Sequence, residues 1–378
     1  MTTFNETELQ SKTIDWLRFP LAILVIFIHM DPVVNMQSVD FLNLNLHSWY
    51  DITGTLVSKT IAEIAVPCFY MFSGFLFFNK IKEWNKTLYI TKVKTRLRTL
   101  VVPYILFNLC ALVLFAIPKI LQADGSIDVY LHKLLDNWVG VFWNYTSWTA
   151  DYQNIFGQPL INYGPCALPL WFLRDLIVMA FISPIVYYLV KYTGIWGLVV
   201  LFCFYYTKIW VEIPGYSANL FLTAFFYFSL GAFFSVNKKN IVISLRKYRF
   251  VWFIVAAVAM LLSVYFSKTP YFKFFLPVFV LSGVISAVNI TSNLMERGKL
   301  QVPEMLTKAS FFIYCTHYIL ILGALNTLFK KIAGEDNVGA LFVTYFTVPF
   351  LCAALTLCIY LLMRRFTPRL LSLFTGNR

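Results

Sequence analysis

The sequence has little charge for its length. Lysine, arginine, aspartate and glutamate together make up 13% of the 378 residues, whereas hydrophobic side chains make up 59%. Soluble domains carry about 25% charged residues, so this chain has too few polar side chains to cover a surface that faces water. The composition excludes an ordinary soluble protein and predicts an integral membrane protein.

Cysteine patterns and a cleavable leader are also missing. The seven cysteines form no CxxC pair and no zinc-type spacing, and only Cys166 lies in a segment expected outside the cytoplasm. The sequence therefore predicts neither a disulfide framework nor a metal site. Before the first apolar segment, Glu6 and Glu8 outnumber Lys12, and no small-residue cleavage site follows. We therefore predict a retained helix instead of a signal peptide.

The apolar residues fall into runs that are long enough to cross a bilayer as helices. They predict an all-α polytopic membrane protein with about ten transmembrane helices, because only helices or closed barrels satisfy backbone polar groups in lipid. We expect one membrane domain over residues 1–378, with no appended soluble domain. The predicted spans are 14–30, 57–79, 100–120, 168–190, 195–210, 219–236, 250–267, 272–290, 309–329 and 339–363.

Lysine and arginine in the loops predict the orientation. With the N-terminus in the cytoplasm, 21 of these residues lie in cytoplasmic segments and seven in outer segments. Short cytoplasmic loops retain positive charge, so both termini are predicted to be cytoplasmic, in a bacterial inner membrane. The same bias accounts for the net charge of +13, and nucleic acid is not predicted as a partner.

The longest outer segment, at about 121–167, mixes carboxylates with aromatic rings. Aromatic faces beside carboxylates suit sugar rings, which offer CH faces and hydroxyl groups. The alternative is an aromatic belt at the membrane interface, which also enriches tryptophan and tyrosine. The residues concerned are Asp124, Asp128, Asp136, Asp151, Trp138, Trp143, Tyr145, Trp148, Tyr152 and Tyr163.

Six ionisable residues inside predicted spans are the main clues to function, because each costs about 2.5–3.5 kcal/mol unless it faces a partner or a polar cavity. They are Arg18, His29, Glu63, Arg174, Asp175 and His317. Arg18 and His29 are eleven residues apart, which is about 16 Å and three turns along one helix. The two side chains could line one channel. Alternatively, Arg18 extends to lipid phosphates, and His29 makes an interhelical hydrogen bond or lies at the outer interface.

A basic loop precedes the third predicted span. Lys94, Arg96 and Arg98 lead directly into that span, and arginine binds phosphate oxygens through paired hydrogen bonds. The loop could therefore bind a polyanionic cytosolic ligand if the first and third spans pack together. The alternative is an ordinary cytoplasmic loop with retained positive charge.

Five motifs in order resemble the integral-membrane acyltransferase family 3. They are RFPLAILVIFIH with Arg18 and His29, VPCFYMFSGFLFF (66–78), KTRLRTLVVPY (94–104), LWFLRDLIV (170–178) and FFIYCTHYILI (311–321). The resemblance covers nearly the whole chain. The family's RxxR pair before the third helix is replaced here by Arg96 and Arg98, with Lys94 upstream.

The resemblance implies transfer of an acyl group, usually acetyl, from cytoplasmic acyl-coenzyme A to a hydroxyl group. The acceptor would be a surface or exported glycan or a lipid-linked sugar. It also implies a catalytic role for His29 and a donor-binding role for Arg18. Neutral imidazole can take the hydroxyl proton as the thioester is attacked. Arg96 and Arg98 are expected to hold coenzyme A phosphates together with Arg18.

Other candidates have less certain partners. Glu63 could orient the imidazole of His29, although Asp31 competes for that role. Trp171, Arg174 and His317 are candidates for acceptor binding. Arg174 could instead form a structural ion pair, although its neighbour Asp175 is expected to point in another direction. His317 could act as a second catalytic group or as a packing donor.

Two alternatives to this enzyme class stay open in the sequence. A transporter or flippase would line its path with the same charges, although no internal repeat or matched pair of broken helices is evident. The unrelated membrane-bound O-acyltransferases also use a histidine. The sequence contains no GxSxG motif and no activated-cysteine signature, so it leaves open whether transfer is direct or passes through an acyl-enzyme.

Overall fold

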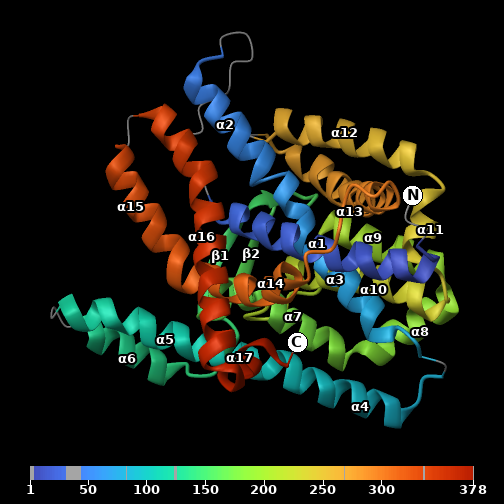
Figure 1. Cartoon of the computed structure of the whole chain (residues 1–378), viewed down its shortest axis with the longest axis horizontal. Helices are drawn as coiled ribbons and strands as arrows, with labels where there is room; N and C mark the ends of the chain where they lie inside the picture. The colour runs from blue at the N-terminus through green and yellow to red at the C-terminus, as the bar shows by residue number, and fades with distance from the viewer. Residues whose placement is uncertain are drawn as a thin grey trace.

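The computed structural model describes residues 4–30, 44–81, 83–122, 126–267, 269–334 and 337–377. Over these ranges the chain is a bundle of α-helices with one two-stranded hairpin (Figure 1). The α-helices are α1 (Glu6–Ile28), α2 (Leu46–Val57), α3 (Ala65–Phe78), α4 (Lys86–Arg96), α5 (Val102–Gln122), α6 (Ser126–Asp136), α7 (Trp171–Phe181), α8 (Ser183–Thr193), α9 (Ile195–Thr207), α10 (Ala218–Val236), α11 (Ile241–Arg246), α12 (Arg249–Tyr265), α13 (Phe272–Glu296), α14 (Glu304–Thr316), α15 (Gly323–Ala333), α16 (Val338–Phe366) and α17 (Pro368–Thr375).

Short elements join these helices. The 3₁₀ turns are η1 (Ile61–Ile64), η3 (Gly140–Phe142) and η4 (Leu168–Leu170), and the π-helical turns are η2 (Leu97–Val101) and η5 (His317–Leu322). The strands β1 (Thr146–Gln153) and β2 (Pro159–Gly164) pair antiparallel, with an irregular register between Thr149 and Gln153. This hairpin is the β-structure that interrupts the helices of the outer segment predicted from the sequence.

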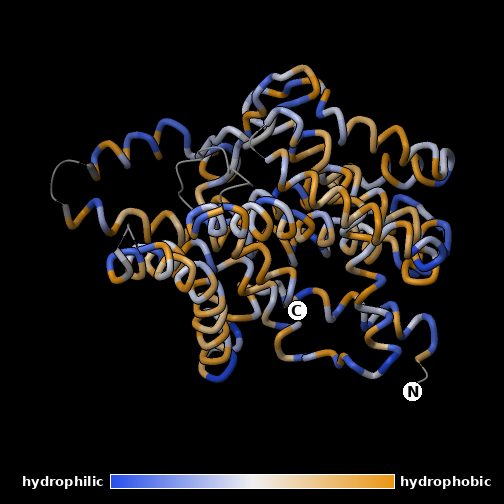
Figure 2. Tube along the Cα trace, turned by 90° about the horizontal axis from the view of Figure 1, so that it is seen from above, coloured by the Kyte–Doolittle hydropathy of each residue, from blue (hydrophilic) through white to orange (hydrophobic). Residues whose placement is uncertain are grey.

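The ten predicted apolar segments are largely helical, although 57–79 begins at the last residue of α2, and 168–190 and 309–329 each cover two helices. Among the described residues, five helical stretches are long and apolar enough to cross a membrane, and two bent pairs raise the number to seven. The all-α polytopic class is thus consistent with the structure, whereas ten spans and the sides of the termini stay predictions. Hydrophobic residues run along the central helices, and hydrophilic stretches lie mainly at helix ends and connections (Figure 2).

The bends in the two pairs have local causes. The turn between α7 and α8 measures 66°, and Pro184 at the start of α8 lacks the N–H that would continue the helix. The 60° bend between α14 and α15 coincides with the wide π-turn η5. Such π-turns often mark functional sites. This bend places His317 where α14 meets the end of α1.

Asparagine side chains start five of the helices. Asn5, Asn45, Asn85, Asn240 and Asn337 each accept a hydrogen bond from the backbone N–H three residues later. An asparagine cap satisfies one of the free donors in the first helical turn. The starts of α1, α2, α4, α11 and α16 are therefore encoded locally.

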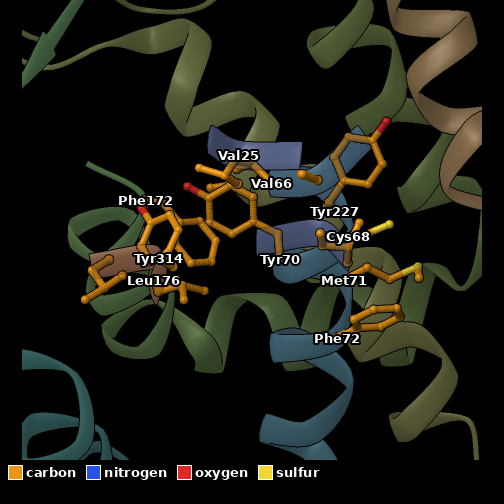
Figure 3. Close-up of a cluster of buried hydrophobic side chains, with 14 of the residues drawn as sticks. Val25, Val66, Cys68, Tyr70, Met71, Phe72, Phe172, Leu176, Tyr227 and Tyr314 are labelled. Carbon is orange, nitrogen blue, oxygen red and sulfur yellow. The ribbon is translucent and has the colours of Figure 1, made fainter. Parts of the chain in front are cut away.

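The helix α1 runs through the middle of the molecule and packs against α3, α13 and α14 (Figure 1). Its neighbour α3 lies in the core, where Tyr70, Met71 and Phe72 are buried in one cluster with Val25 of α1 and Tyr227 of α10 (Figure 3). Deeply buried helices without a polar face are typical of the centre of a membrane bundle.

Two glycines allow α3 and α10 to approach closely. A Cβ atom on Gly231 would lie 1.8 Å from the carbonyl oxygen of Met71, and one on Gly74 would lie 2.0 Å from that of Phe228. Both obstacles are backbone atoms, so the helices would have to separate. Small residues at such contacts let membrane helices pack with their backbones close together.

We expect Gly231→Ala to destabilise the folded protein by about 1–3 kcal/mol, because the added methyl group overpacks the α3–α10 contact. The measurement is the midpoint of thermal unfolding in detergent. Gly323→Ala is the matched control, since a Cβ atom there meets nothing within 4 Å. Equal midpoints for the two variants would contradict the close contact.

Candidate active site

Two histidines from opposite ends of the chain lie side by side. His29 follows the last residue of α1, and its ring centroid lies 5.4 Å from that of His317. The ring of Tyr318 lies 5.0 Å from His29. His29, the proposed general base, thus lies beside His317, for which the sequence left a catalytic role and a packing role open.

His317 is fully buried and is held by its own helix. Its Nδ1 lies 2.7 Å from the backbone carbonyl oxygen of Tyr314, one turn earlier in α14. The carbonyl can only accept, so Nδ1 carries the hydrogen and donates it. The other nitrogen, Nε2, is buried without a hydrogen-bond partner in the described part of the chain.

A cavity of about 400 Å³ lies between α1, α3, α4, α7 and α14. Three basic side chains reach it from different elements: Arg18, Arg96 and Lys308. Most of the remaining lining is aromatic or aliphatic, with three small hydroxyl side chains: Phe69, Phe72, Ser73, Leu76, Leu100, Phe172, Leu176, Thr307, Ser310, Phe311 and Tyr314. The cavity combines a cationic cluster with a largely apolar wall, as a ligand with a charged end and a slender apolar arm would require.

The helix α14 connects this cavity to the histidines. Tyr314 lines the cavity, and its ring centroid lies 6.1 Å from that of His317. Figure 3 shows Tyr314 beside Phe172 and Leu176, which also line the cavity. The hydroxyl of Tyr314 donates to the carbonyl oxygen of Pro169, which ties α14 to the start of α7.

Neighbouring groups partly balance the positive charges of the three basic side chains that line the cavity. Arg18 forms an ion pair of 3.1 Å with Asp15, and about a third of each side chain is exposed. Lys308 lies 3.5 Å from Glu304, and the guanidinium of Arg96 lies over the ring of Phe77. Exposed ion pairs of this kind contribute about 0–1 kcal/mol, so these cations can exchange partners for a bound anion.

Arg98 lies elsewhere. With the Asn377 amide turned so that its oxygen faces the guanidinium, the two groups are 3.0–3.1 Å apart, beside α17. Arg98 does not belong to the cavity lining, whereas Arg96 does. The binding of coenzyme A phosphates by Arg96 and Arg98 stays a prediction.

Lys308 and the aromatic wall were not identified from the sequence. In the sequence, Lys308 is one of the 21 lysine and arginine residues assigned to cytoplasmic segments, and it was given no other role. A signal was present, because Thr307, Ser310, Phe311, Tyr314 and His317 follow the three- and four-residue spacing of one helix face. That face of α14 carries both the cavity lining and the second histidine.

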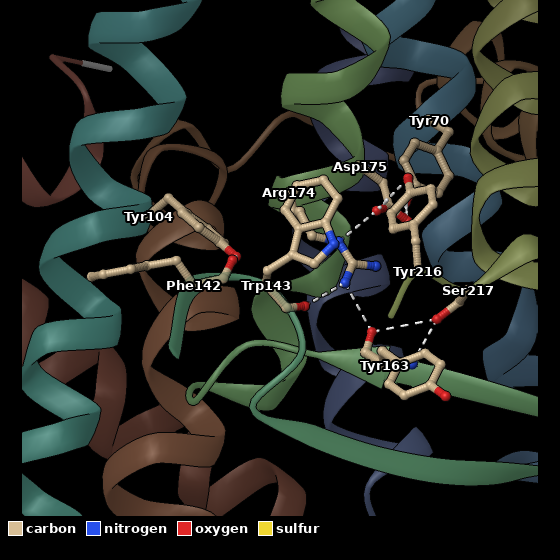
Figure 4. A network of polar contacts seen from close by, with 9 residues as sticks. All are labelled: Tyr70, Tyr104, Phe142, Trp143, Tyr163, Arg174, Asp175, Tyr216 and Ser217. Atoms are coloured by element: carbon tan, nitrogen blue, oxygen red, sulfur yellow. Dashed lines mark hydrogen bonds and ion pairs between the residues drawn. The ribbon is translucent and has the colours of Figure 1, made fainter. Parts of the chain in front are cut away.

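The expectation that Arg174 and Asp175 do not pair is wrong. Arg174 Nε lies 2.9 Å from Asp175 Oδ1, and the two side chains are 2% and 0% exposed. Successive residues of a helix do point in different directions, but the long arginine side chain folds back toward its neighbour. Tyr216 also donates to Asp175 Oδ1, and Tyr70 donates to Oδ2 (Figure 4).

Arg174 also holds the outer segment. Its Nη1 donates to the backbone carbonyl oxygens of Trp143 and Tyr163, at 2.8 and 2.9 Å. The rings of Trp143 and Tyr216 lie against the guanidinium, with 5.3 and 4.7 Å between its carbon and the ring centroids (Figure 4). Burial and the Asp175 carboxylate raise the pKa of Tyr216 well above its ordinary value, which keeps this phenol neutral and donating.

This geometry establishes the structural ion pair that the sequence left as one alternative for Arg174. Direct binding of an acceptor by Arg174 stays a prediction. Trp171, the first residue of α7, is partly buried against the core, and its proposed acceptor contact is likewise a prediction.

Glu63 lies in η1, which packs against α1. The structure gives it an electrostatic interaction with the buried Lys208. Lys208 also donates to the hydroxyl of Thr223 over 3.2 Å. The role of Glu63 in orienting His29 stays a prediction, and its competitor Asp31 lies outside the described residues.

The aromatic residues of the outer segment have mixed surroundings. Trp138 is 66% exposed, whereas Trp143 stacks on Tyr216 and Tyr145 lies beneath Lys133. Asp124 lies outside the described residues, as do the side chains of Asp151 and Tyr152. Glycan contact by this segment stays a prediction, and part of its aromatic content holds the Arg174 network together.

Neither a disulfide nor a metal-type cluster is present among the described residues. None of the seven cysteines forms a disulfide, and burial raises the pKa of Cys166 to about 12, which keeps it protonated. Over the same ranges, no three side chains of histidine, cysteine, aspartate or glutamate gather as a metal would need.

The fold and the cavity define a polytopic membrane protein that encloses a cationic site next to a histidine pair. The chain belongs to the acyltransferase family whose acyltransferase domain matches residues 11–365. The family indicated by the motifs is thereby confirmed, and the protein is a membrane acyltransferase. The succinoglycan biosynthesis protein ExoH of Rhizobium meliloti (strain 1021) is 25% identical over 380 residues, which cover 97% of this chain and 92% of ExoH. No solved structure matches the chain.

Proposed function

We propose that this enzyme transfers an acyl group, most often acetyl in the family, from acyl-coenzyme A to a hydroxyl group of an exported glycan or lipid-linked sugar. The observation that carries the proposal is a cavity lined by Arg18, Arg96 and Lys308, whose lining residue Tyr314 on α14 lies next to His317 and so close to His29. The similarity to a succinoglycan biosynthesis protein supports a polysaccharide acceptor. Membership of the acyltransferase family favours this function over a transporter.

The donor would enter at the basic cluster. The guanidinium groups of the arginines and the lysine ammonium suit the phosphates of coenzyme A. The rest of the lining mixes apolar and hydroxyl side chains, which suits the methylene and amide groups of the slender pantetheine arm. Arg18 and His29 lie about 16 Å apart along α1, a distance that an extended arm can span. The loop charges favour a position of the basic cluster on the cytoplasmic side of a bacterial inner membrane, which would give it access to cytoplasmic acyl-coenzyme A.

His29 would act as the general base. It accepts the proton of the acceptor hydroxyl as the oxygen attacks the thioester carbonyl, and a C–O bond forms. The C–S bond then breaks, and the coenzyme A thiolate takes the proton back from the imidazolium. Atoms and charge balance without a redox partner, and general base catalysis of this kind contributes about 10²- to 10⁴-fold in rate.

The donor site can be tested with membranes that contain the protein, labelled acetyl-coenzyme A and glycan lipids of the host. We expect Arg18→Ala and Arg96→Ala each to raise KM for acetyl-coenzyme A by about 10- to 100-fold, the effect of losing a charge-assisted hydrogen bond. Lys12→Ala is the matched control, because Lys12 is a partly exposed cation of α1 that pairs with Glu8.

Arg98→Ala, compared with Arg96→Ala, would decide which arginine holds the donor. Unchanged KM values for both Arg18 and Arg96 variants would contradict the donor site. Movement of intact glycan lipid across the membrane, without incorporation of label, would support the transporter alternative instead.

A further inference from the structure

The buried lone pair of His317 has no role in the mechanism as described so far. Nδ1 of this ring donates to the carbonyl oxygen of Tyr314, so Nε2 is left as an acceptor. It is buried and has no hydrogen-bond partner in the ranges that the structure describes. A buried acceptor without a donor destabilises the fold, so it calls for an explanation, and a catalytic role is one of them.

Of the rings around His317, that of His29 lies nearest. Three aromatic rings lie near His317: His29 at 5.4 Å, Tyr314 at 6.1 Å and Tyr318 at 6.4 Å between centroids. The hydroxyl of Tyr314 is already bonded to the carbonyl oxygen of Pro169. His29 is the nearest of the three and carries a ring N–H in every protonation state that occurs near neutral pH.

We propose that His317 is a positioning residue for His29, an inference that rests on the proposed function. In the reacting state, Nε2 of His317 accepts a hydrogen bond from the ring N–H of His29. This bond determines which nitrogen of His29 carries the free lone pair and turns that nitrogen toward the acceptor hydroxyl. After His29 has taken the hydroxyl proton, the same bond stabilises the imidazolium.

This arrangement gains and loses no proton over the whole reaction. The hydroxyl proton moves to the free nitrogen of His29 and then to the coenzyme A thiolate. His317 keeps its Nδ1 hydrogen throughout and neither gains nor loses a proton. The role is that of the residue that orients the base in a catalytic triad, supplied here by a neutral imidazole.

The backbone around His317 suits this role. The residue begins the π-turn η5, at the 60° bend between α14 and α15. Its carbonyl oxygen accepts a contact of 3.7 Å from the thiol of Cys352 in α16. The ring is thus held from α14, and its backbone is held from α16, so Nε2 has a defined position beside His29.

Two variants of His317 separate the lone pair from the shape of the ring. Phe supplies a ring without an acceptor, whereas Gln supplies an acceptor oxygen at the end of a side chain of similar reach. We expect His317→Phe to lower kcat by about 10- to 100-fold, as for the loss of other groups that orient a histidine. KM for acetyl-coenzyme A and the Kd of coenzyme A should stay unchanged, and His317→Gln should retain more activity than His317→Phe.

His132→Phe is the matched control, because His132 also has Nδ1 within 2.8 Å of a backbone carbonyl oxygen but is exposed on α6. Wild-type kcat in His317→Phe would overturn the inference, and so would equal losses in the Phe and Gln variants. Loss of coenzyme A binding in both would indicate a structural role and would also overturn it. The proposed function fails separately, if His29→Ala retains full activity.

Discussion

Replacing His29 by alanine is expected to lower kcat for acyl transfer by about 10²- to 10⁴-fold, the usual contribution of a general base. A sugar hydroxyl is a poor nucleophile until its proton is removed, and His29 is the histidine at the end of α1, beside the buried His317. The cations that would hold the donor lie in the cavity at Arg18, Arg96 and Lys308. KM for acetyl-coenzyme A should therefore change little.

The measurement is the initial rate of label incorporation at saturating donor, with equal amounts of folded protein. His132→Ala provides the comparison, since this histidine is exposed on α6. The donor-site variant Arg18→Ala should show the opposite pattern, with a raised KM and a smaller change in kcat. If His29→Ala incorporated label at the wild-type rate, another group would have to be the base.

Arg174→Met is expected to lower the free energy of unfolding by about 3–5 kcal/mol, because it leaves the carboxylate of Asp175 buried without its counter-charge. Asp175 is fully buried, and its ion pair with Arg174 measures 2.9 Å. The change also removes the hydrogen bonds that hold the carbonyl oxygens of Trp143 and Tyr163. The outer segment should loosen together with the start of α7.

Unfolding by titration with SDS in detergent micelles would measure this loss. Arg246→Met is the matched control, since the pair of Arg246 with Glu296 has a similar length of 2.8 Å but is 31% and 38% exposed. Its loss should cost less than about 1 kcal/mol. The double variant Arg174→Met with Asp175→Asn should recover part of the stability. Equal effects for the Arg174 and Arg246 variants would contradict the importance of burial.

The elements of the fold were largely predictable because their signals are local. A run of apolar residues is enough to predict a helix in lipid, and each of the ten predicted segments is largely helical. The β1–β2 hairpin and the π-turn η5 were not predicted. Their geometry depends on contacts with distant segments, such as the hydrogen bond from the backbone N–H of Tyr163 to the hydroxyl of Ser217.

The candidate site was predicted only in part. The sequence identified Arg18, His29, Arg96 and His317 as separate ionisable residues, but it did not indicate the pairing of the two histidines. It also placed Arg98 with Arg96, whereas only Arg96 belongs to the cavity lining. Residues two apart on a helix point about 200° apart, and the rotation of the helix decides which of them faces the cavity.

The sequence by itself determined the class of protein, the helical segments and the family, because composition, apolar run length and ordered motifs do not depend on how helices pack. Only the tertiary structure decided which side chains share a site. In the folded chain, Arg18, Arg96 and Lys308 line one cavity. His317 lies against His29, and Arg174 forms an ion pair with Asp175. These contacts depend on the rotation, bending and close approach of helices that are far apart in the chain, and residue spacing alone does not specify them.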